Sequence, residues 1–207
     1  MVRFIVGITG GSGVGKTTLI NLLYKEFKGR ASTFSLDNYY LPKEAQQKDE
    51  NGVINFDLPT ALDAANLEKD IQLLTKGEQI RQAVYGFNNP QQEKAEQFIE
   101  PKELLIVEGL YVMYYPFLRT ILDYSVYLMV EKELQLQRRL HRDMNERNYA
   151  AEDIIYQWQN HVLPSYKAHV EPFKDESDLI ITNNEGFDDN IHILLAKIHE
   201  KLDLSFE

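Results

Sequence analysis

The stretch from Ile5 to Thr18 reads IVGITGGSGVGKTT, in which an apolar run meets a cluster of glycines. The apolar run predicts a strand, and the pattern that begins near Lys16 predicts a helix. Between them, Gly10 and Gly15-Lys16-Thr17 fit the Walker A pattern G-x-x-x-x-G-K-[ST]. An ordinary glycine-rich turn is the alternative, and the strand on one side with the helix on the other argues against it. The stretch therefore predicts a phosphate-binding loop, or P-loop.

Each part of this loop has its own task in holding phosphate groups. Glycines let the backbone curl so that several N–H groups point at one anion, with the positive end of the following helix behind them. We expect Lys16 to reach the β- and γ-phosphates and the Thr17 hydroxyl to bind Mg²⁺. The residues expected around the phosphates are Gly10, Gly11, Ser12, Gly13, Val14, Gly15, Lys16, Thr17 and Thr18. The predicted cofactors are Mg²⁺ and ATP, with GTP as the alternative nucleotide.

The composition of the chain narrows its class and its partners. A chain of 207 residues suits one α/β domain with appendages. It has no cysteine, which fits a reducing compartment. No signal segment precedes the P-loop, and no apolar run approaches the ~20 residues of a membrane span, so the expected location is cytoplasmic. A net charge of −10 argues against general binding to nucleic acid or to anionic membranes.

Strand and helix patterns alternate along the chain. Apolar runs predict further strands over 31–36, 104–107, 124–130 and 179–181. Helical spacing predicts helices over 16–27, 62–77, 131–147, 152–169 and 191–202, and a small hairpin is expected with arms at 80–87 and 97–99. Residues 38–52 are expected to form a long loop. This alternation predicts a doubly wound, mostly parallel sheet with helices on both faces, in which ligands bind at the carboxyl ends of the strands.

Two acids stand at such strand ends. Glu108 follows the apolar run 104–107, where an acid can bind Mg²⁺ directly or through water; a helix cap or a surface ion pair is the alternative. Asp37 follows the strand over 31–36 and is a candidate base for phosphoryl transfer, in which a weak base suffices because the proton leaves late. Its alternative is an Asx turn or helix N-cap, because Asp before Asn is common in turns.

Arginines gather in one segment of this acidic chain. On a helix, Arg139 and Arg142 share a face and could close over a γ-phosphate. The alternative is a pair of solvated i,i+4 ion pairs, Arg139 with Asp143 and Arg142 with Glu146. The histidines in and after this segment, His141, His161 and His169, lack the spacing of a zinc site and are interpreted as surface or packing residues.

Taken together, the motifs resemble those of the uridine kinase and phosphoribulokinase family of P-loop kinases, and those of uridine-cytidine kinases most closely. The resemblance runs from Ile5 to about Ile181. Beyond the P-loop, its pieces are Ser35-Leu36-Asp37-Asn38-Tyr39-Tyr40, Asn55-Phe56-Asp57 with Pro59, Ala61 and Asp63, Glu108-Gly109, Arg138-Arg139, Arg142-Asp143, Glu146-Arg147, and Gln157 ahead of Pro164. Several short motifs in one order are more specific than any one of them.

The resemblance implies a role for each matching residue. Asp37 would accept the proton of a sugar 5′-hydroxyl, Asp57 would hold the ribose hydroxyls, and Glu108 with Thr17 would bind Mg²⁺. Residues 138–157 are similar to the family's mobile lid, in which Arg139 and Gln157 would face the nucleoside and Arg142 and Arg147 the phosphates. The catalytic residues expected are Asp37, Lys16, Arg139 and Arg142. The substrate-binding residues expected are Asp37, Tyr40, Asp57, Tyr85, Phe87, Arg139 and Gln157.

The resemblance also implies an overall organisation. Residues 1–207 would form a single P-loop kinase domain with a β-hairpin insertion over about 79–100. Members of the family tend to form homotetramers, partly through that hairpin, so a homo-oligomer is the expected assembly.

Three positions depart from the family pattern, and all concern recognition of the base. Pro90 and Gln92 stand where the family hairpin has a histidine and an arginine, and Tyr149 replaces a second lid arginine. A site that hydrogen-bonds its substrate rejects a wrong one by leaving polar groups unpaired, so losing these groups should weaken selectivity for pyrimidines.

The expected function is ATP- and Mg²⁺-dependent phosphorylation of the 5′-hydroxyl of a ribonucleoside such as uridine or cytidine, in nucleoside salvage. The first alternative is a kinase of the same fold that acts on another small alcohol: a vitamin riboside such as nicotinamide riboside, pantothenate or a sugar phosphate. Further alternatives are a switch that hydrolyses nucleoside triphosphates and a family member that only binds ligands.

Overall fold

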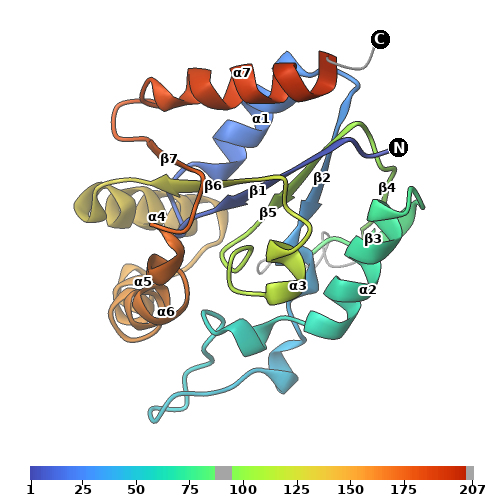
Figure 1. The fold of residues 1–207 in the computed structure, drawn as a ribbon. Helices are drawn as coiled ribbons and strands as arrows, with labels where there is room; N and C mark the ends of the chain where they lie inside the picture. Colours follow the sequence, from blue (N-terminus) through green and yellow to red (C-terminus); the bar gives the residue numbers. More distant parts are fainter. Residues whose placement is uncertain (87–94, 204–207) are drawn as a thin grey trace.

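Five parallel strands form the central sheet, in the order β2-β5-β1-β6-β7 (Figure 1). The computed structural model describes residues 1–86 and 95–203. The strands are β1 (Phe4–Thr9), β2 (Ala31–Ser35), β5 (Leu104–Glu108), β6 (Tyr124–Met129) and β7 (Leu179–Thr182). The strands that precede the P-loop, Asp37 and Glu108 are therefore neighbours, as the sequence predicts, and their carboxyl ends meet at one edge.

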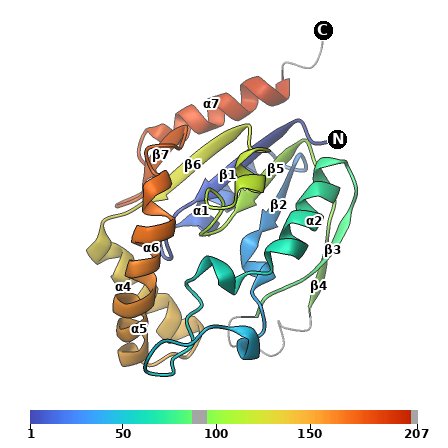
Figure 2. The same cartoon turned by 60° about the horizontal axis from the view of Figure 1, so that its bottom comes forward.

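Helices cover both faces of this sheet (Figures 1 and 2). On one face lie α1 (Lys16–Glu26) and α7 (Asn190–Asp203), and on the other lie α2 (Ala64–Thr75) and α3 (Pro116–Arg119). Toward the carboxyl ends of the strands lie α4 (Lys132–Glu146), α5 (Ala151–Gln157) and α6 (Leu163–His169). In the part of the chain that the structure describes, none of the helices has the length and apolar character needed to cross a membrane.

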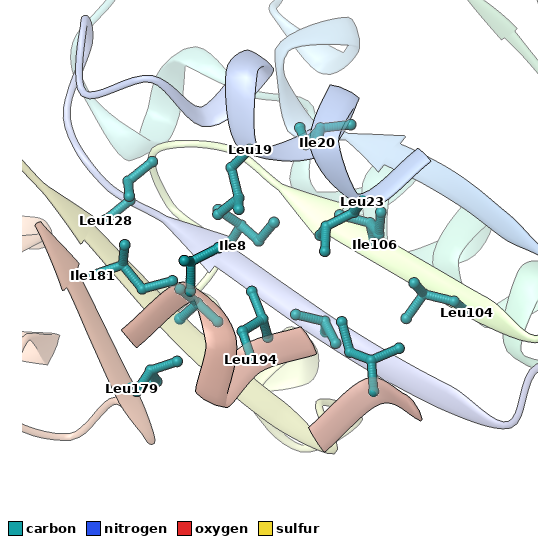
Figure 3. Close-up of a cluster of buried hydrophobic side chains, with 14 of the residues drawn as sticks. Ile8, Leu19, Ile20, Leu23, Leu104, Ile106, Leu128, Leu179, Ile181 and Leu194 are labelled. Atoms are coloured by element: carbon teal, nitrogen blue, oxygen red, sulfur yellow. The ribbon is translucent and has the colours of Figure 1, made fainter. Parts of the chain in front are cut away.

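Strand residues alternate between two buried apolar clusters, one on each face. Val6 and Ile106 pack on the side of α1 and α7, as Figure 3 shows for Ile106, and Ile5 and Val107 pack on the side of α2. Both faces of the central strands are thus removed from water, which is why these strands are continuous apolar runs in the sequence. The doubly wound α/β fold is confirmed.

The smaller elements surround the site. The hairpin has arms β3 (Ile80–Ala83) and β4 (Glu96–Ile99), so the first arm is shorter than expected. The 3₁₀ turns are η1 (Leu36–Tyr39), η2 (Lys43–Ala45), η3 (Pro59–Ala61) and η6 (Glu171–Phe173). Neither these turns nor α3 was expected, because three- and four-residue elements carry too few residues for a periodic pattern.

The helix predicted over 152–169 contains a π-helical turn, η5 (Trp158–Val162), between α5 and α6. Its i→i+5 hydrogen bonds widen the helix locally. Sequence periodicity gives no sign of this turn, because the apolar spacing on either side remains helical.

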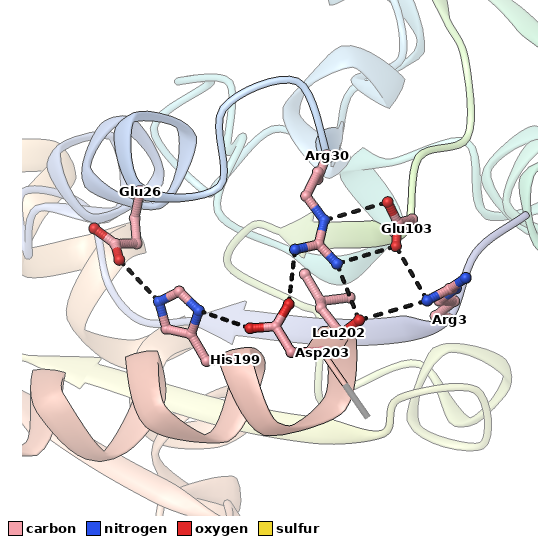
Figure 4. A network of polar contacts seen from close by, with 7 residues as sticks. All are labelled: Arg3, Glu26, Arg30, Glu103, His199, Leu202 and Asp203. Atoms are coloured by element: carbon pink, nitrogen blue, oxygen red, sulfur yellow. Dashed lines mark hydrogen bonds and ion pairs between the residues drawn. The ribbon is translucent and has the colours of Figure 1, made fainter. Parts of the chain in front are cut away.

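A polar network holds the end of α7 against the other end of the sheet (Figure 4). Arg30 donates to Glu103, to Asp203 at 2.9 Å and to the carbonyl of Leu202 at 3.0 Å. His199 lies 2.8 Å from Glu26 on α1. These partly exposed pairs fix the position of α7, while its buried apolar side chains supply most of its stability.

Replacing Leu194 by alanine should lower the free energy of unfolding by about 2–5 kcal/mol, because this α7 side chain is fully buried and its removal leaves a cavity. The matched control is Ile193→Ala, whose side chain is 51% exposed and whose loss should cost at most about 0.5 kcal/mol. Urea unfolding of the two variants measures both. Equal losses would show that α7 does not pack on the sheet as described.

Candidate active site

The P-loop joins β1 to α1 at the carboxyl end of the sheet. Gly15 caps α1 with a φ of 100°, a left-handed conformation, and a Cβ there would lie 2.3 Å from Asn183 Nδ2. Gly10, with a φ of 149°, would place a Cβ 2.3 Å from the carbonyl oxygen of Leu128. Both positions therefore require glycine for conformation and for space. The resulting concave backbone, at the start of a helix, fits a phosphate group.

Side chains from α4 and from the end of β7 hold the loop in this shape. Gln135 Nε2 donates to the carbonyl of Ser12 at 2.7 Å, and Asn183 Nδ2 donates to that of Val14 at 2.8 Å. Arg142 donates to the Ser12 hydroxyl at 3.0 Å. Lys16 Nζ lies over the loop, where it donates to the carbonyl of Gly10 at 3.0 Å. A basic side chain thus lies on each side of the expected phosphate position.

Glu108 ends β5 as a half-buried carboxyl beside β2. Ser35, its register partner on β2, donates to Glu108 Oε1 at 2.5 Å. Burial, with the nearby charge of Asp37, raises the pKa of Glu108 to about 7, although Lys16 and the Ser35 hydrogen bond act in the opposite direction. An acid that is held this way without a full counter-charge is suited to a divalent cation.

Asp143 is the centre of the arginine cluster. This carboxylate on α4 is 2% exposed and lies 2.8 Å from Arg142, 3.2 Å from Arg147 and 3.4 Å from Arg139. The i,i+4 pair of Arg139 with Asp143 therefore exists, but it is buried rather than solvated. Burial and the charge of Arg142 lower the pKa of Arg147. Three guanidinium groups around one carboxylate leave an excess of positive charge, which suits a phosphate chain.

A carboxylate and aromatic rings also line the pocket. Burial raises the pKa of Asp57, and the positive charges of Arg139 and His161 oppose that rise. The ring of Tyr40 lies 5.0 Å from that of Tyr85 and 6.2 Å from that of Phe56, measured between centroids. Such a combination suits a ligand with both hydroxyl groups and a flat ring.

One pocket joins these parts. It is lined by ten of the residues expected at the site: Ser12, Lys16, Asp37, Tyr40, Asp57, Tyr85, Arg139, Arg142, Arg147 and Gln157. Arg139 Nη2 donates to Gln157 Oε1 at 3.4 Å within it. Glu108 is not among the lining residues, Thr17 and Thr18 are exposed on the first turn of α1, and the remaining P-loop residues form the loop itself. Phe87 lies outside the described residues, as do Pro90 and Gln92.

Five further residues line the pocket without having been assigned as site residues from the sequence: Lys43, Phe56, Leu110, Asp143 and Tyr149. Phe56 and Asp143 stand inside matched motifs, where only their neighbours were assigned roles. Tyr149 follows Asn148, whose φ of 55° turns the chain in the left-handed conformation that a glycine would adopt without strain. Lys43 and Leu110 reach the pocket from segments with no motif, so no sequence signal identifies them.

The arrangement fits a nucleotide and a metal ion. The P-loop presents its backbone at the start of α1, and the charge of Lys16 acts on the Glu108 carboxyl. Within residues 1–86 and 95–203, no group of three His, Cys, Asp or Glu side chains could hold a metal. A cation at Glu108 would therefore take its other ligands from Thr17, from phosphate oxygens and from water, as is usual for Mg²⁺.

Comparison with known proteins gives matches over nearly the whole chain. Residues 5–187 match the model of the Phosphoribulokinase / Uridine kinase family. A protein of Clostridium perfringens named uridine kinase is 33% identical over 198 residues, which cover 95% of each chain.

Solved structures share the fold at lower identity. Phosphoribulokinase from Rhodobacter spheroides has a TM-score of 0.63 at 16% identity, covering 88% of this chain and 70% of that one. D-glycerate 3-kinase from Cryptococcus neoformans has a TM-score of 0.63 at 17% identity, covering 88% and 86%.

The raised pKa of Glu108 predicts a pH-dependent stability difference. The ordinary pKa is 4.5 and the folded value is about 7, so the unfolded chain loses this proton first and stability falls as pH rises between those values. Glu108→Gln removes the buried charge. Without nucleotide or Mg²⁺, we expect this variant to be about 1–3 kcal/mol more stable than wild type at pH 8 and nearly equal to it at pH 4.5.

Thermal melts at the two pH values measure the difference. The control is Glu185→Gln, which changes an exposed carboxyl and should give the same difference from wild type at both. A Glu108→Gln variant with no advantage at pH 8 would contradict the burial of this charge.

Proposed function

Because the chain belongs to the phosphoribulokinase and uridine kinase family and is an ATP-dependent small-molecule kinase, we propose that it transfers the γ-phosphoryl group of Mg²⁺-ATP to the 5′-hydroxyl of a ribonucleoside. The match over residues 5–187 supports the reaction type. The relative from Clostridium perfringens, named uridine kinase, supports a nucleoside as the acceptor.

The observation that carries the proposal is the arrangement of charge in one pocket. Lys16, Arg142 and Arg147 line its phosphate end, and Asp57 with the rings of Tyr40 and Tyr85 lines the other. Asp37 lines the same pocket, in the 3₁₀ turn that follows β2. An acid in a pocket that also carries phosphate-binding and hydroxyl-binding groups could orient an acceptor hydroxyl toward the γ-phosphorus.

In this mechanism the residues of the chain mainly position and neutralise. Asp37 accepts a hydrogen bond from the attacking 5′-hydroxyl and takes its proton late, because the transition state of phosphoryl transfer is loose. Lys16 and Arg142 balance the charge of the transferred group, and Arg139 lies between it and the acceptor. Mg²⁺, which Thr17 and Glu108 would hold, neutralises charge on the phosphate oxygens when it is bound.

The acceptor end favours a ring held by stacking more than by hydrogen bonds. Phe56, Tyr40 and Tyr85 form an aromatic group there, and Tyr149 lines the pocket where the family resemblance places an arginine. Aromatic contacts tolerate different rings, whereas polar groups reject those that leave them unpaired. We therefore propose uridine and cytidine as acceptors, with weaker discrimination against other ribosides. Solved structures with the same fold are named as kinases of other acceptors, so the fold alone does not identify the acceptor.

The proposal extends to cellular setting and assembly. Nucleoside salvage and a homotetramer come from the family resemblance, a cytoplasmic location comes from the sequence pattern, and no nucleic acid or membrane partner is proposed.

The test is ADP release by purified protein with Mg²⁺-ATP and a panel of acceptors. We expect release that depends on uridine or cytidine, with measurable turnover on at least one vitamin riboside such as nicotinamide riboside. Release that depends only on pantothenate or a sugar phosphate would replace the nucleoside as acceptor. Equal release without any acceptor would indicate an NTP-hydrolysing switch, and no release across the panel would leave a ligand-binding member of the family.

Asp37→Asn should lower kcat by about 10²–10⁴-fold, because asparagine cannot take a proton, while ATP binding measured by calorimetry stays within about twofold. The control is Asp175→Asn, an exposed position whose kcat should not change. Near-normal turnover in Asp37→Asn would remove Asp37 as the base.

A further inference from the structure

A buried histidine joins two segments that line the pocket. The first segment is the loop that precedes η3 and carries Phe56 and Asp57, and the second is the helical run α5-η5-α6, which carries Gln157. Figure 2 shows this loop beside α5 and α6. His161, in η5, is 2% exposed, and its Nε2 lies 2.8 Å from Asp49 Oδ2 in the loop. These two residues are 112 positions apart and share no motif, so sequence reasoning does not pair them.

Asp49 organises its own loop with one oxygen. Its Oδ1 accepts from the backbone N–H of Asn51 at 2.9 Å and from that of Val53 at 2.8 Å. Its backbone N–H donates to the carbonyl of Val53, and Lys48 forms a bridge with Ile54. The loop is therefore a tight turn with a fixed shape, and the second oxygen, Oδ2, faces the helices.

Two side chains of the α5-η5-α6 run form hydrogen bonds with Asp49 Oδ2. Tyr156 OH donates to Oδ2 at 2.7 Å, alongside His161, and itself accepts from Asn51 Nδ2 at 2.7 Å. The hydrogen bond from Tyr156, with that from His161, lowers the pKa of Asp49 to about 2, so the acceptor is a carboxylate at neutral pH. Hydrogen bonds to an ionised acceptor are stronger than neutral ones.

The π-helical turn makes this double contact possible. In a regular α-helix, residues five apart point about 140° away from each other around the axis. Tyr156 and His161 are five apart, yet they reach the same oxygen, and their rings meet edge to face at 5.8 Å. The widened turn, Trp158–Val162, begins two residues after Tyr156 and contains His161. A regular helix would direct one of the two away from the loop.

The imidazole of His161 has an energetic cost of burial that packing alone does not explain. His161 Nδ1 is buried and has no hydrogen-bond partner in the part of the chain that the structure describes. Burying an unsatisfied polar atom is unfavourable, and a phenyl ring would fill the space without that cost. The bond from Nε2 to Asp49 is what the imidazole adds.

The contact lies next to two expected substrate ligands. Asn55 Oδ1 accepts from the backbone N–H of Asp57 at 2.9 Å, and Asn55 N donates to Gln47, so the turn continues directly into the pocket wall. On the other side, Tyr156 immediately precedes Gln157. The distance between Asp57 and Gln157 is thus set by how firmly the turn is attached to the helices.

We propose that Asp49, Tyr156 and His161 form an acceptor clamp, in which His161 is a positioning residue that holds Asp57 and Gln157 at the separation the acceptor requires. The inference rests on the proposed function, because it assigns Asp57 and Gln157 to the acceptor. The phosphate end of the pocket, which is held by Gln135 and Asn183, does not depend on the clamp.

Steady-state kinetics test acceptor binding and ATP binding separately, with the acceptor of the panel that supports the fastest ADP release. His161→Phe and Asp49→Asn should raise the KM for the acceptor by about tenfold, while the KM for ATP stays within about twofold. His161→Gln keeps an N–H donor and should restore most of the acceptor KM. The matched control is His199→Phe, which breaks a histidine–acid pair on α7 and should leave both constants unchanged. If His161→Phe does not fold, Asp49→Asn and His161→Gln make the same comparison.

The outcomes distinguish this inference from the proposed function. An active wild-type enzyme whose clamp variants keep the acceptor KM, or raise both KM values together, would overturn the clamp alone. A wild-type protein with no acceptor-dependent ADP release would overturn the proposed function, and the clamp with it.

Discussion

The structure depends on placing opposite charges at the ends of three neighbouring parallel strands. β1 leads into the P-loop, β5 ends at Glu108 and β2 leads to Asp37, in the order β2-β5-β1. Because parallel strands end at the same edge, residues far apart in sequence meet there. Burial disfavours the charged form of Glu108 and raises its pKa. The charge of Lys16 offsets part of that rise. A bound cation and phosphate chain would balance the remaining charge.

Two carboxylates, neither of which is expected to act in catalysis, hold the walls of the pocket in place. Asp143 gathers Arg139, Arg142 and Arg147 at one side, and Asp49 joins the acceptor loop to η5 at the other. Both are carboxylates that accept several hydrogen bonds or ion pairs, and neither needs to touch the reacting atoms. In the proposed mechanism the strand ends carry the groups for phosphoryl transfer, while loop-to-helix contacts set the space for the acceptor.

The sequence predicts the parts that depend on local pattern. The P-loop, the alternation of strands and helices and the neighbouring positions of Asp37 and Glu108 follow from short motifs and apolar runs. The π-helical turn and the Asp49–His161 contact could not be predicted, because the first leaves apolar spacing unchanged and the second joins residues without a shared motif. The arginine ion pairs were ambiguous, since spacing alone does not say whether Asp143 is buried or solvated. Phe87 lies outside the described residues, so its role stays a prediction.

The central claim is that this pocket passes a phosphoryl group to an acceptor hydroxyl and does not merely hydrolyse a nucleotide. Phosphorus-31 NMR of a reaction containing the protein, Mg²⁺-ATP and uridine tests it directly. The account predicts a phosphomonoester resonance of the nucleoside 5′-monophosphate that grows with ADP and is absent when 5′-deoxyuridine replaces uridine. Growth of inorganic phosphate alone, at equal rates with both nucleosides, would contradict it.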